Sequence, residues 1–355
     1  MKKISVHDVI DISIGAAILG SGGGGNPRMG RLIAEHALEK YGPVDLISAE
    51  MLTDDAVIIP ISFMGAPTVF HEKILSGNEL PNVIAKAAQI TGKHPTHLMN
   101  CEIGGINATA AIAPAARLGL PVVDGDLISR AFPEIQMVLL NPEGIPMSPL
   151  VIADDKNNIV TMDVINHAWG ETISRALVNK MGGVGAIALP ALSGKTLRQV
   201  ISKGTMSKAK SIGQTIRKAR EQHEDLIDAI CTELSGNNIF SGKVIDVERR
   251  LSDGFIRGSI IIEKNMNHFL KQMKIDFQNE YLIASIDGET IVTTPDLISV
   301  VEKTTGEALP ADTIHYGCDV AVISSKADKR WYSKKGLAIV GPEYFGYSCK
   351  YGDAR

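Results

Sequence analysis

The stretch VIIPIS at residues 57–62 is a continuous apolar run rich in β-branched residues. Such a run predicts a buried strand. Two further strand-like segments follow at residues 97–101 and 121–124, and helix-compatible segments separate the three. Because strands that alternate with helices pair mainly in parallel, the sequence predicts an α/β layered domain with a largely parallel sheet.

The pattern changes near residue 236, after which short strand-like segments follow one another closely. Asp253-Gly254 and Asp287-Gly288 lie between such segments and are typical hairpin turns. A chain of 355 residues is also longer than one hydrophobic core usually supports. We therefore expect an α/β domain in residues 1–236 and a smaller, β-barrel-like or sandwich domain in residues 237–355.

Composition excludes several classes of protein. The net charge of −4 argues against a general nucleic-acid binder. No apolar run reaches the roughly 18 residues that a membrane span needs, and the acidic residues Asp8 and Asp11 near the N-terminus argue against a signal peptide. The four cysteines contain no C-x-x-C pair, so we expect a reduced, cytoplasmic protein without a cysteine zinc cluster.

A glycine-rich segment, GSGGGGNP at residues 20–27, lies between two helix-compatible stretches. Consecutive glycines have no side chains to bury, so we interpret them as exposing backbone N–H groups to a ligand. Asn26-Pro27 is typical of a helix start, with Asn as the N-cap and proline at the first helical position. The loop is predicted to hold an anion or a carbonyl oxygen; a flexible connector is the alternative. No Lys-Ser/Thr pair follows and no strand precedes, so we expect no nucleotide cofactor.

Polar clusters follow the predicted strands, at residues 62–72, 101–107 and 124–130. Functional groups in α/β sheets gather at the carboxyl ends of strands. We therefore expect these three clusters to converge on one crevice beside the glycine loop.

Several motifs together resemble the S-methyl thiohydantoin desulfurase-like family. They are GSGGGGNP at 20–27, GAPTV at 65–69 with Glu72-Lys73, EIGGIN at 102–107, DGD at 124–126, RAFPE at 130–134 and GPEYFGY at 341–347. The resemblance covers nearly the whole chain and implies a three-layer α/β domain followed by a β-barrel domain. Members are often encoded near hydantoinase- or oxoprolinase-type enzymes. Some act on thiohydantoin rings, replacing the C2 sulfur by oxygen.

Carboxylates are the candidate catalytic groups, because neighbouring carboxylates separate one another's pKa values into an acid and a base. Glu102 is our first choice as general base, with helix capping as its structural alternative. Asp126 is the second choice, as acid or metal ligand. The predicted catalytic residues are Glu102, Asp126 and Glu72, and Asp124 and Glu134 belong to the same carboxylate cluster.

Other side chains are predicted to bind the substrate. Arg130 lies one helical turn from Asp126 in a predicted helix and could bind a substrate carboxylate or form a structural salt bridge. Asn107 could orient a ring carbonyl or be an ordinary polar residue of a helix. Cys101 could be a nucleophile, although a core position is favoured. The predicted substrate-binding residues are Gly22, Gly23, Gly24, Gly25, Asn26, Asn107, Asp124 and Arg130.

Two functions remain open from the sequence. The first is a hydrolase that acts on a small hydantoin- or thiohydantoin-like ring, with water attacking the C2 carbon. The second is a non-catalytic, ligand-binding subunit of a hydantoinase-type partner. We expect a homo-oligomer that takes a small-molecule substrate, and the cofactor is unknown. A divalent ion bound by carboxylates is left open, and a histidine-based metal site is disfavoured.

Overall fold

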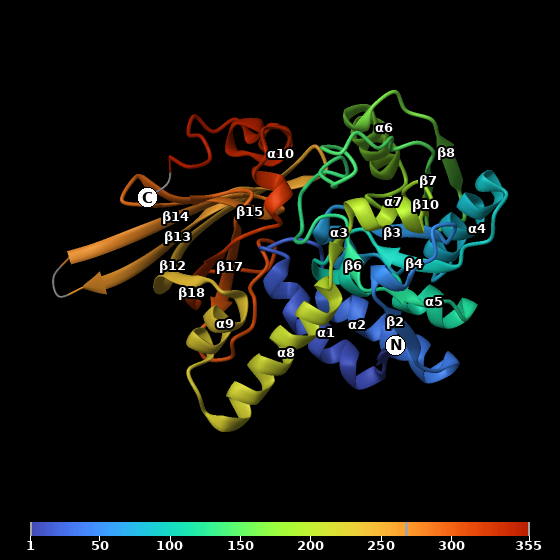
Figure 1. Ribbon diagram of the computed structural model, residues 1–355. Helices are drawn as coiled ribbons and strands as arrows, with labels where there is room; N and C mark the ends of the chain where they lie inside the picture. The colour runs from blue at the N-terminus through green and yellow to red at the C-terminus, as the bar shows by residue number, and fades with distance from the viewer. Residues whose placement is uncertain (1, 267–268, 354–355) are drawn as a thin grey trace.

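The computed structural model of the chain describes residues 2–266 and 269–353. It is a mixed α/β structure built on two main sheets, which lie side by side in Figure 1. The larger sheet is formed within residues 2–193, and an antiparallel sheet follows within residues 237–325. In the described residues, no helix has the length and apolar character needed to cross a membrane.

The larger sheet has nine strands and is mixed rather than largely parallel, so that part of the prediction was too simple. Its four neighbours β2, β5, β4 and β3 are parallel, whereas every other pairing is antiparallel. The extra strands arise because β7 and β8 form a hairpin, whose strands must run antiparallel, and β9 then inserts between β7 and β3. In sheet order, the strands are β1 (Lys2–Ile4), β2 (Val44–Ile47), β5 (Val122–Val123), β4 (His97–Asn100), β3 (Val57–Gly65), β9 (Val184–Ala188), β7 (Leu150–Ala153) and β8 (Ile159–Met162), with β10 (Leu192–Ser193) beside β3.

Apolar side chains are buried on both faces of this sheet. Alternate residues of β3 divide between two cores, with Ile59 and Ile61 on one side and Ile58 on the other, as the two-residue period of a strand requires. One face is covered by α1 (Val6–Leu19), α2 (Pro27–Tyr41), α4 (Glu79–Thr91), α5 (Ile112–Leu118) and α8 (Thr205–Gln222). The other face is covered by α6 (His167–Lys180), α7 (Gly194–Val200) and the segment 127–147.

The segment after β6 (Gly125–Asp126) differs from the sequence prediction. We expected Asp126 and Arg130 to lie one turn apart in a helix, but residues 127–134 contain no helix. The Asp126 carboxylate accepts the backbone N–H of Ser129 at 2.9 and 3.0 Å, and Ser129 has a φ of +74°. A side-chain-to-backbone turn of this kind competes with helix formation. The remaining short elements are α3 (Pro67–Glu72), β11 (Ser202–Lys203), which pairs with β6, and the 3-10 helices η1 (Ala49–Met51) and η2 (Gly105–Thr109).

The second sheet has seven antiparallel strands, follows α9 (Leu226–Leu234), and confirms the predicted β-rich second part. Both Asp-Gly hairpins are confirmed: Asp253 and Gly254 have φ values of +54° and +81°, and Asp287 and Gly288 of +50° and +89°. In sheet order, the strands are β16 (Glu289–Thr293), β15 (Glu280–Ile286), β14 (Phe269–Gln278), β13 (Phe255–Met266), β12 (Asn237–Ser252), β18 (Asp319–Ser325) and β17 (Leu297–Glu302).

The segment after β18 returns to the first sheet. It contains η3 (Lys329–Tyr332), α10 (Lys334–Val340) and η4 (Pro342–Phe345). Trp331 and Val340 are fully buried in the same core as Ile58 and Met99 of the larger sheet. One of the two cores of the larger sheet is therefore completed by residues from near the end of the chain. The predicted division of the chain into two domains at residue 236 stays a prediction.

Candidate active site between the two sheets

A cavity of about 80 Å³ lies where the two sheets meet. Its walls come from the glycine loop, β3, the loop after β4, the irregular segment 128–138 and the junction between β14 and β15. The aromatic rings of Phe63, Phe70 and Phe132 contribute apolar surface, and Phe63 and Phe70 meet edge to face at 5.7 Å. A space of this size, larger than a single water needs, suits a few waters or a compact planar ring.

Glu102 lies in this cavity, directly after β4, and only 8% of its surface is exposed. Its Oε1 accepts a hydrogen bond from Asn107 Nδ2 at 2.6 Å, and its carboxylate also accepts the backbone N–H of Phe132. Burial raises the pKa of Glu102 from 4.5 to about 7, against the opposing effects of these donors and of the Arg130 charge. Glu102 can therefore exchange a proton near neutral pH.

Asn107 also lines the cavity, but its amide is used by the protein itself. Its Nδ2 donates to the Phe63 carbonyl at 3.1 Å as well as to Glu102, and its Oδ1 accepts the Phe63 N–H at 2.8 Å. These bonds fix the amide between β3 and the loop after β4. Asn107 therefore holds the Glu102 carboxylate in place. The contact between Asn107 and a substrate carbonyl stays a prediction.

Some glycines of the loop line the cavity, and others pack against the second sheet. Gly24 and Gly25 line the cavity. Gly22 and Gly23 face the second sheet instead: a Cβ at Gly22 would lie 2.5 Å from the Tyr281 ring, and one at Gly23 would lie 1.9 Å from Glu280 Oε1. Our inference that these glycines have no packing role is therefore wrong, because here the missing side chains allow close packing.

The end of the glycine-rich segment begins α2. Asn26 Oδ1 accepts the backbone N–H groups of Arg28 at 2.9 Å and Met29 at 3.3 Å, so the predicted N-cap is confirmed. Asn26 is not among the residues that line the cavity.

Glu280, at the start of β15, lines the same cavity and was not identified from the sequence. It is only 2% exposed, and its carboxyl group accepts the backbone N–H of Gly24. Burial and the nearby Glu102 charge raise its pKa well above the ordinary value. The only local signal was a run of three polar residues, 278–280, between two strand-like segments.

Arg130 and Asp126 are fully buried but do not line the cavity. Arg130 Nη1 donates to the carbonyls of Pro295 at 2.8 Å and Asp296 at 2.7 Å, so it joins the two sheets. Asp126 is held by Ser129, and burial raises its pKa well above the ordinary value. The hydrogen-bond partners of Arg130 differ from those of Asp126, because the intervening segment is a turn rather than a helix.

Two other predicted site residues lie apart from the cavity lining. Asp124 binds Ser207 of α8, accepting its backbone N–H at 3.0 Å and its hydroxyl at 2.5 Å. Glu72 is exposed at the end of α3. The expected convergence is thus seen for Gly24, Gly25, Glu102 and Asn107, but the structure does not bring Asp124 or Glu72 to the same cavity.

Glu134 and Cys101 also line the cavity. Glu134 Oε2 accepts the Tyr344 hydroxyl at 2.6 Å, and its Oε1 accepts Gln278 Nε2 at 3.2 Å. Cys101 belongs to the core under the sheet, and burial raises the pKa of its thiol, which opposes formation of a nucleophilic thiolate. Within residues 2–266 and 269–353, no three His, Cys, Asp or Glu side chains form a candidate metal site.

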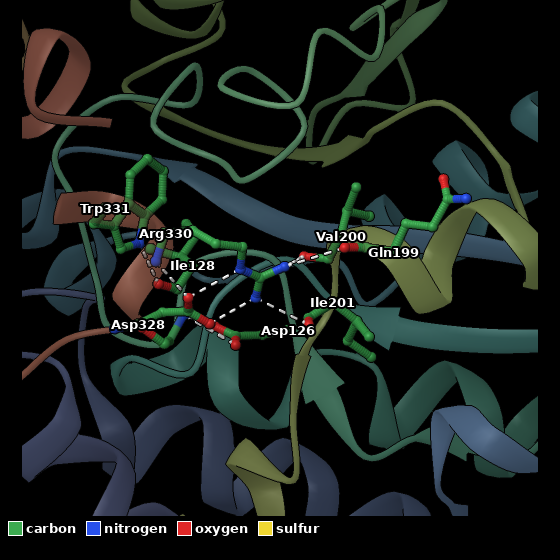
Figure 2. Close-up of polar contacts among 9 residues, drawn as sticks. Asp126, Ile128, Gln199, Val200, Ile201, Asp328, Arg330 and Trp331 are labelled. Atoms are coloured by element: carbon green, nitrogen blue, oxygen red, sulfur yellow. Dashed lines mark hydrogen bonds and ion pairs between the residues drawn. The ribbon is translucent and has the colours of Figure 1, made fainter. Parts of the chain in front are cut away.

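The segment after β18 supports one wall of the cavity (Figure 2). Trp331 Nε1 donates to the carbonyl of Ile128 at 2.8 Å, and Ile128 lines the cavity. Arg330 donates to the carbonyls of Val200 at 2.8 Å and Ile201 at 3.0 Å, while its guanidinium also binds Asp328. The positive charge of Arg330 thus supplies hydrogen bonds to carbonyl groups at the C-terminal end of α7, which lack donors within the helix.

Family comparison accounts for nearly the whole chain. The S-Me-THD-like N-terminal domain matches residues 7–164, and the S-Me-THD-like C-terminal domain matches residues 165–354. The chain belongs to the S-Me-THD-like family. The resemblance inferred from the glycine loop and the acidic motifs is thereby confirmed. Glu102 lies in the first S-Me-THD-like domain and Glu280 in the second.

A solved structure supports the fold. The crystal structure of a protein from Chromobacterium violaceum is 22% identical in sequence, with a TM-score of 0.79 and 98% coverage of each chain. No match was found among curated proteins.

Proposed function

We propose that this S-Me-THD-like protein is a hydrolase that replaces the methylthio group at C2 of an S-methyl thiohydantoin by oxygen from water. The observation that carries this proposal is Glu102, a buried carboxylate with a pKa of about 7 that lines a small, partly aromatic cavity. General bases work best when their pKa lies near the working pH. Membership of the S-Me-THD-like family supports the proposed substrate class, and the position of Glu102 in the cavity supports its proposed role as base.

The proposed reaction needs a base and a closed, ring-sized space. Glu102 takes a proton from water as the oxygen bonds to C2, and the C2–S bond then breaks. The products are the hydantoin carbonyl and methanethiol. Apolar surface from Phe63 and Phe132 suits the face of a flat ring, and the backbone of Gly24 and Gly25 borders the same space. The Gly24 N–H donates to the Glu280 carboxyl group, so the Gly25 N–H is the group suited to bind a ring carbonyl oxygen.

The direct test is to incubate the purified protein with S-methyl thiohydantoins and to follow hydantoin and methanethiol by mass spectrometry. Glu102→Gln retains the shape of the side chain but removes the base. We expect turnover to fall by about 10²–10⁴-fold. Glu248→Gln, at an exposed position of β12, is the matched control and should retain wild-type turnover.

Wild-type activity in Glu102→Gln would remove this residue from the role of base. No turnover by the intact protein, together with tight binding to a hydantoinase-type enzyme, would instead favour the ligand-binding subunit.

A further inference from the structure

Glu280 approaches the site from the second sheet, opposite the segment that carries Glu102. It begins β15, and the neighbouring Tyr281 N–H donates to the Ser21 carbonyl of the glycine loop at 2.8 Å. This bond sets the start of β15 against the loop. Both carboxyl groups line the same cavity and are nearly inaccessible to solvent.

The glycine loop is shaped around this carboxyl group. At Gly23, a Cβ would lie 1.9 Å from Glu280 Oε1 and 2.5 Å from its Cγ. The next residue, Gly24, donates its backbone N–H to the Glu280 carboxyl group. The loop therefore both makes room for Glu280 and holds it.

One oxygen of Glu280 remains available. Oε2 is buried and has no hydrogen-bond partner among the residues described by the structure. The charged side chains that act on this group are Glu102, which opposes its ionisation, and Arg130, which favours it. A buried polar atom without a partner is costly unless something binds it. In a cavity, a ligand can supply that partner.

We propose that Glu280 is the second acid–base residue of this site and donates a proton to the substrate ring while Glu102 activates water. The inference rests on the hydrolase function proposed above. It assigns the two proton-transfer roles to two carboxyl groups that reach one cavity from different sheets.

The proton transfers balance over one turnover. As the C2–O bond forms, Glu102 takes a proton from water and Glu280 gives one to the ring nitrogen that gains electron density. As the C2–S bond breaks, Glu280 takes the proton of the C2 hydroxyl group and Glu102 gives its proton to the departing methanethiolate. Both carboxyl groups thereby return to their starting states, and no oxidant or metal is consumed.

The test compares Glu280→Gln, Glu280→Asp and the exposed control Glu248→Gln. Glu280→Gln should lower kcat by about 10²–10⁴-fold, with a thermal unfolding midpoint close to that of the wild type. Glu280→Asp retains the acid one methylene further away and should retain more activity than the glutamine variant. Infrared difference spectra, recorded at pH 8 without substrate, should show that Glu280→Gln loses a protonated carboxyl band.

The outcomes separate this inference from the proposed function. If Glu280→Gln turns over like the wild type, or if no carboxyl band is lost, Glu280 is not the acid although Glu102 can still be the base. If the wild type converts no S-methyl thiohydantoin, the proposed function and the catalytic role of Glu280 both fall.

Discussion

Folding favours the protonated form of the Glu102 side chain. Its pKa is raised from 4.5 to about 7, so between these pH values the folded protein binds more protons at this residue than the unfolded chain does. The free energy of unfolding must therefore fall as pH rises through this window, by up to about 3 kcal/mol from this residue. Urea denaturation at pH 5 and pH 8 should show a smaller pH dependence in Glu102→Gln than in the wild type. An identical dependence in both would contradict the raised pKa.

Activity should respond to pH in the opposite direction. The proposed base must be ionised, and its pKa of about 7 places that ionisation near neutrality. We expect kcat/KM to increase with pH up to about 7 and then level off, until any loss of the proton on Glu280 lowers it again. A pH–rate profile measured with an S-methyl thiohydantoin checks this. A rate that is independent of pH between 5 and 8 would argue against Glu102 as base.

Gly23 should tolerate no side chain while Glu280 is present. An alanine Cβ would lie within 2.5 Å of three Glu280 side-chain atoms, so Gly23→Ala must displace the carboxyl group or the loop. We expect loss of stability and of turnover. Glu280→Ala removes the obstructing atoms, so Gly23→Ala should destabilise that background much less. A double-mutant cycle by urea denaturation measures the coupling, and additive effects would contradict the proposed contact.

At the scale of single elements, the end of α7 depends on Arg330. Its guanidinium binds the carbonyls of Val200 and Ile201 and is itself held by Asp328. Hydrogen bonds to a charged group contribute about 1.5–3 kcal/mol, so Arg330→Ala should lower the free energy of unfolding by that amount. The neighbouring exposed Lys329 offers the control Lys329→Ala, which should have little effect. Equal stability of the two variants would show that the cap contributes nothing.

Elements defined by local sequence were predictable, and those defined by distant contacts were not. The Asp253-Gly254 and Asp287-Gly288 turns require positive φ, and local composition indicates that directly. The antiparallel direction of β9 beside β3 depends on tertiary pairing, and the local pattern of apolar residues does not determine it. The turn after Asp126 depends on one side-chain hydrogen bond that competes with a helical pattern.

The same distinction applies to the candidate site. Glu102 follows a predicted strand, so its position at the sheet edge could be inferred. Glu280 is 178 residues further along the chain (280 − 102), and no spacing links the two. The packing role of Gly22 and Gly23 also depends on the second sheet and could not be read from the glycine count.

At the scale of the whole molecule, Arg130 joins the two sheets. It is fully buried, and its guanidinium binds the carbonyls of Pro295 and Asp296. Removing this charged donor leaves buried carbonyl groups without a hydrogen-bond partner, at a cost of about 1–3 kcal/mol for each group. Arg130→Met should therefore strongly lower the free energy of unfolding and make urea unfolding less cooperative. Tryptophan fluorescence monitors this unfolding. Arg117→Met, on the exposed surface of α5, is the control and should unfold like the wild type.

The position of Glu280 late in the chain has a consequence during protein synthesis. The ribosome releases Glu102 and the glycine loop long before β15, so a nascent chain displays a loop whose space for Glu280 is still empty. The cavity is completed only when the second sheet reaches that loop. Translation products that stop before residue 280 should thus be inert in the proposed reaction, because one carboxyl group of the cavity is missing from them.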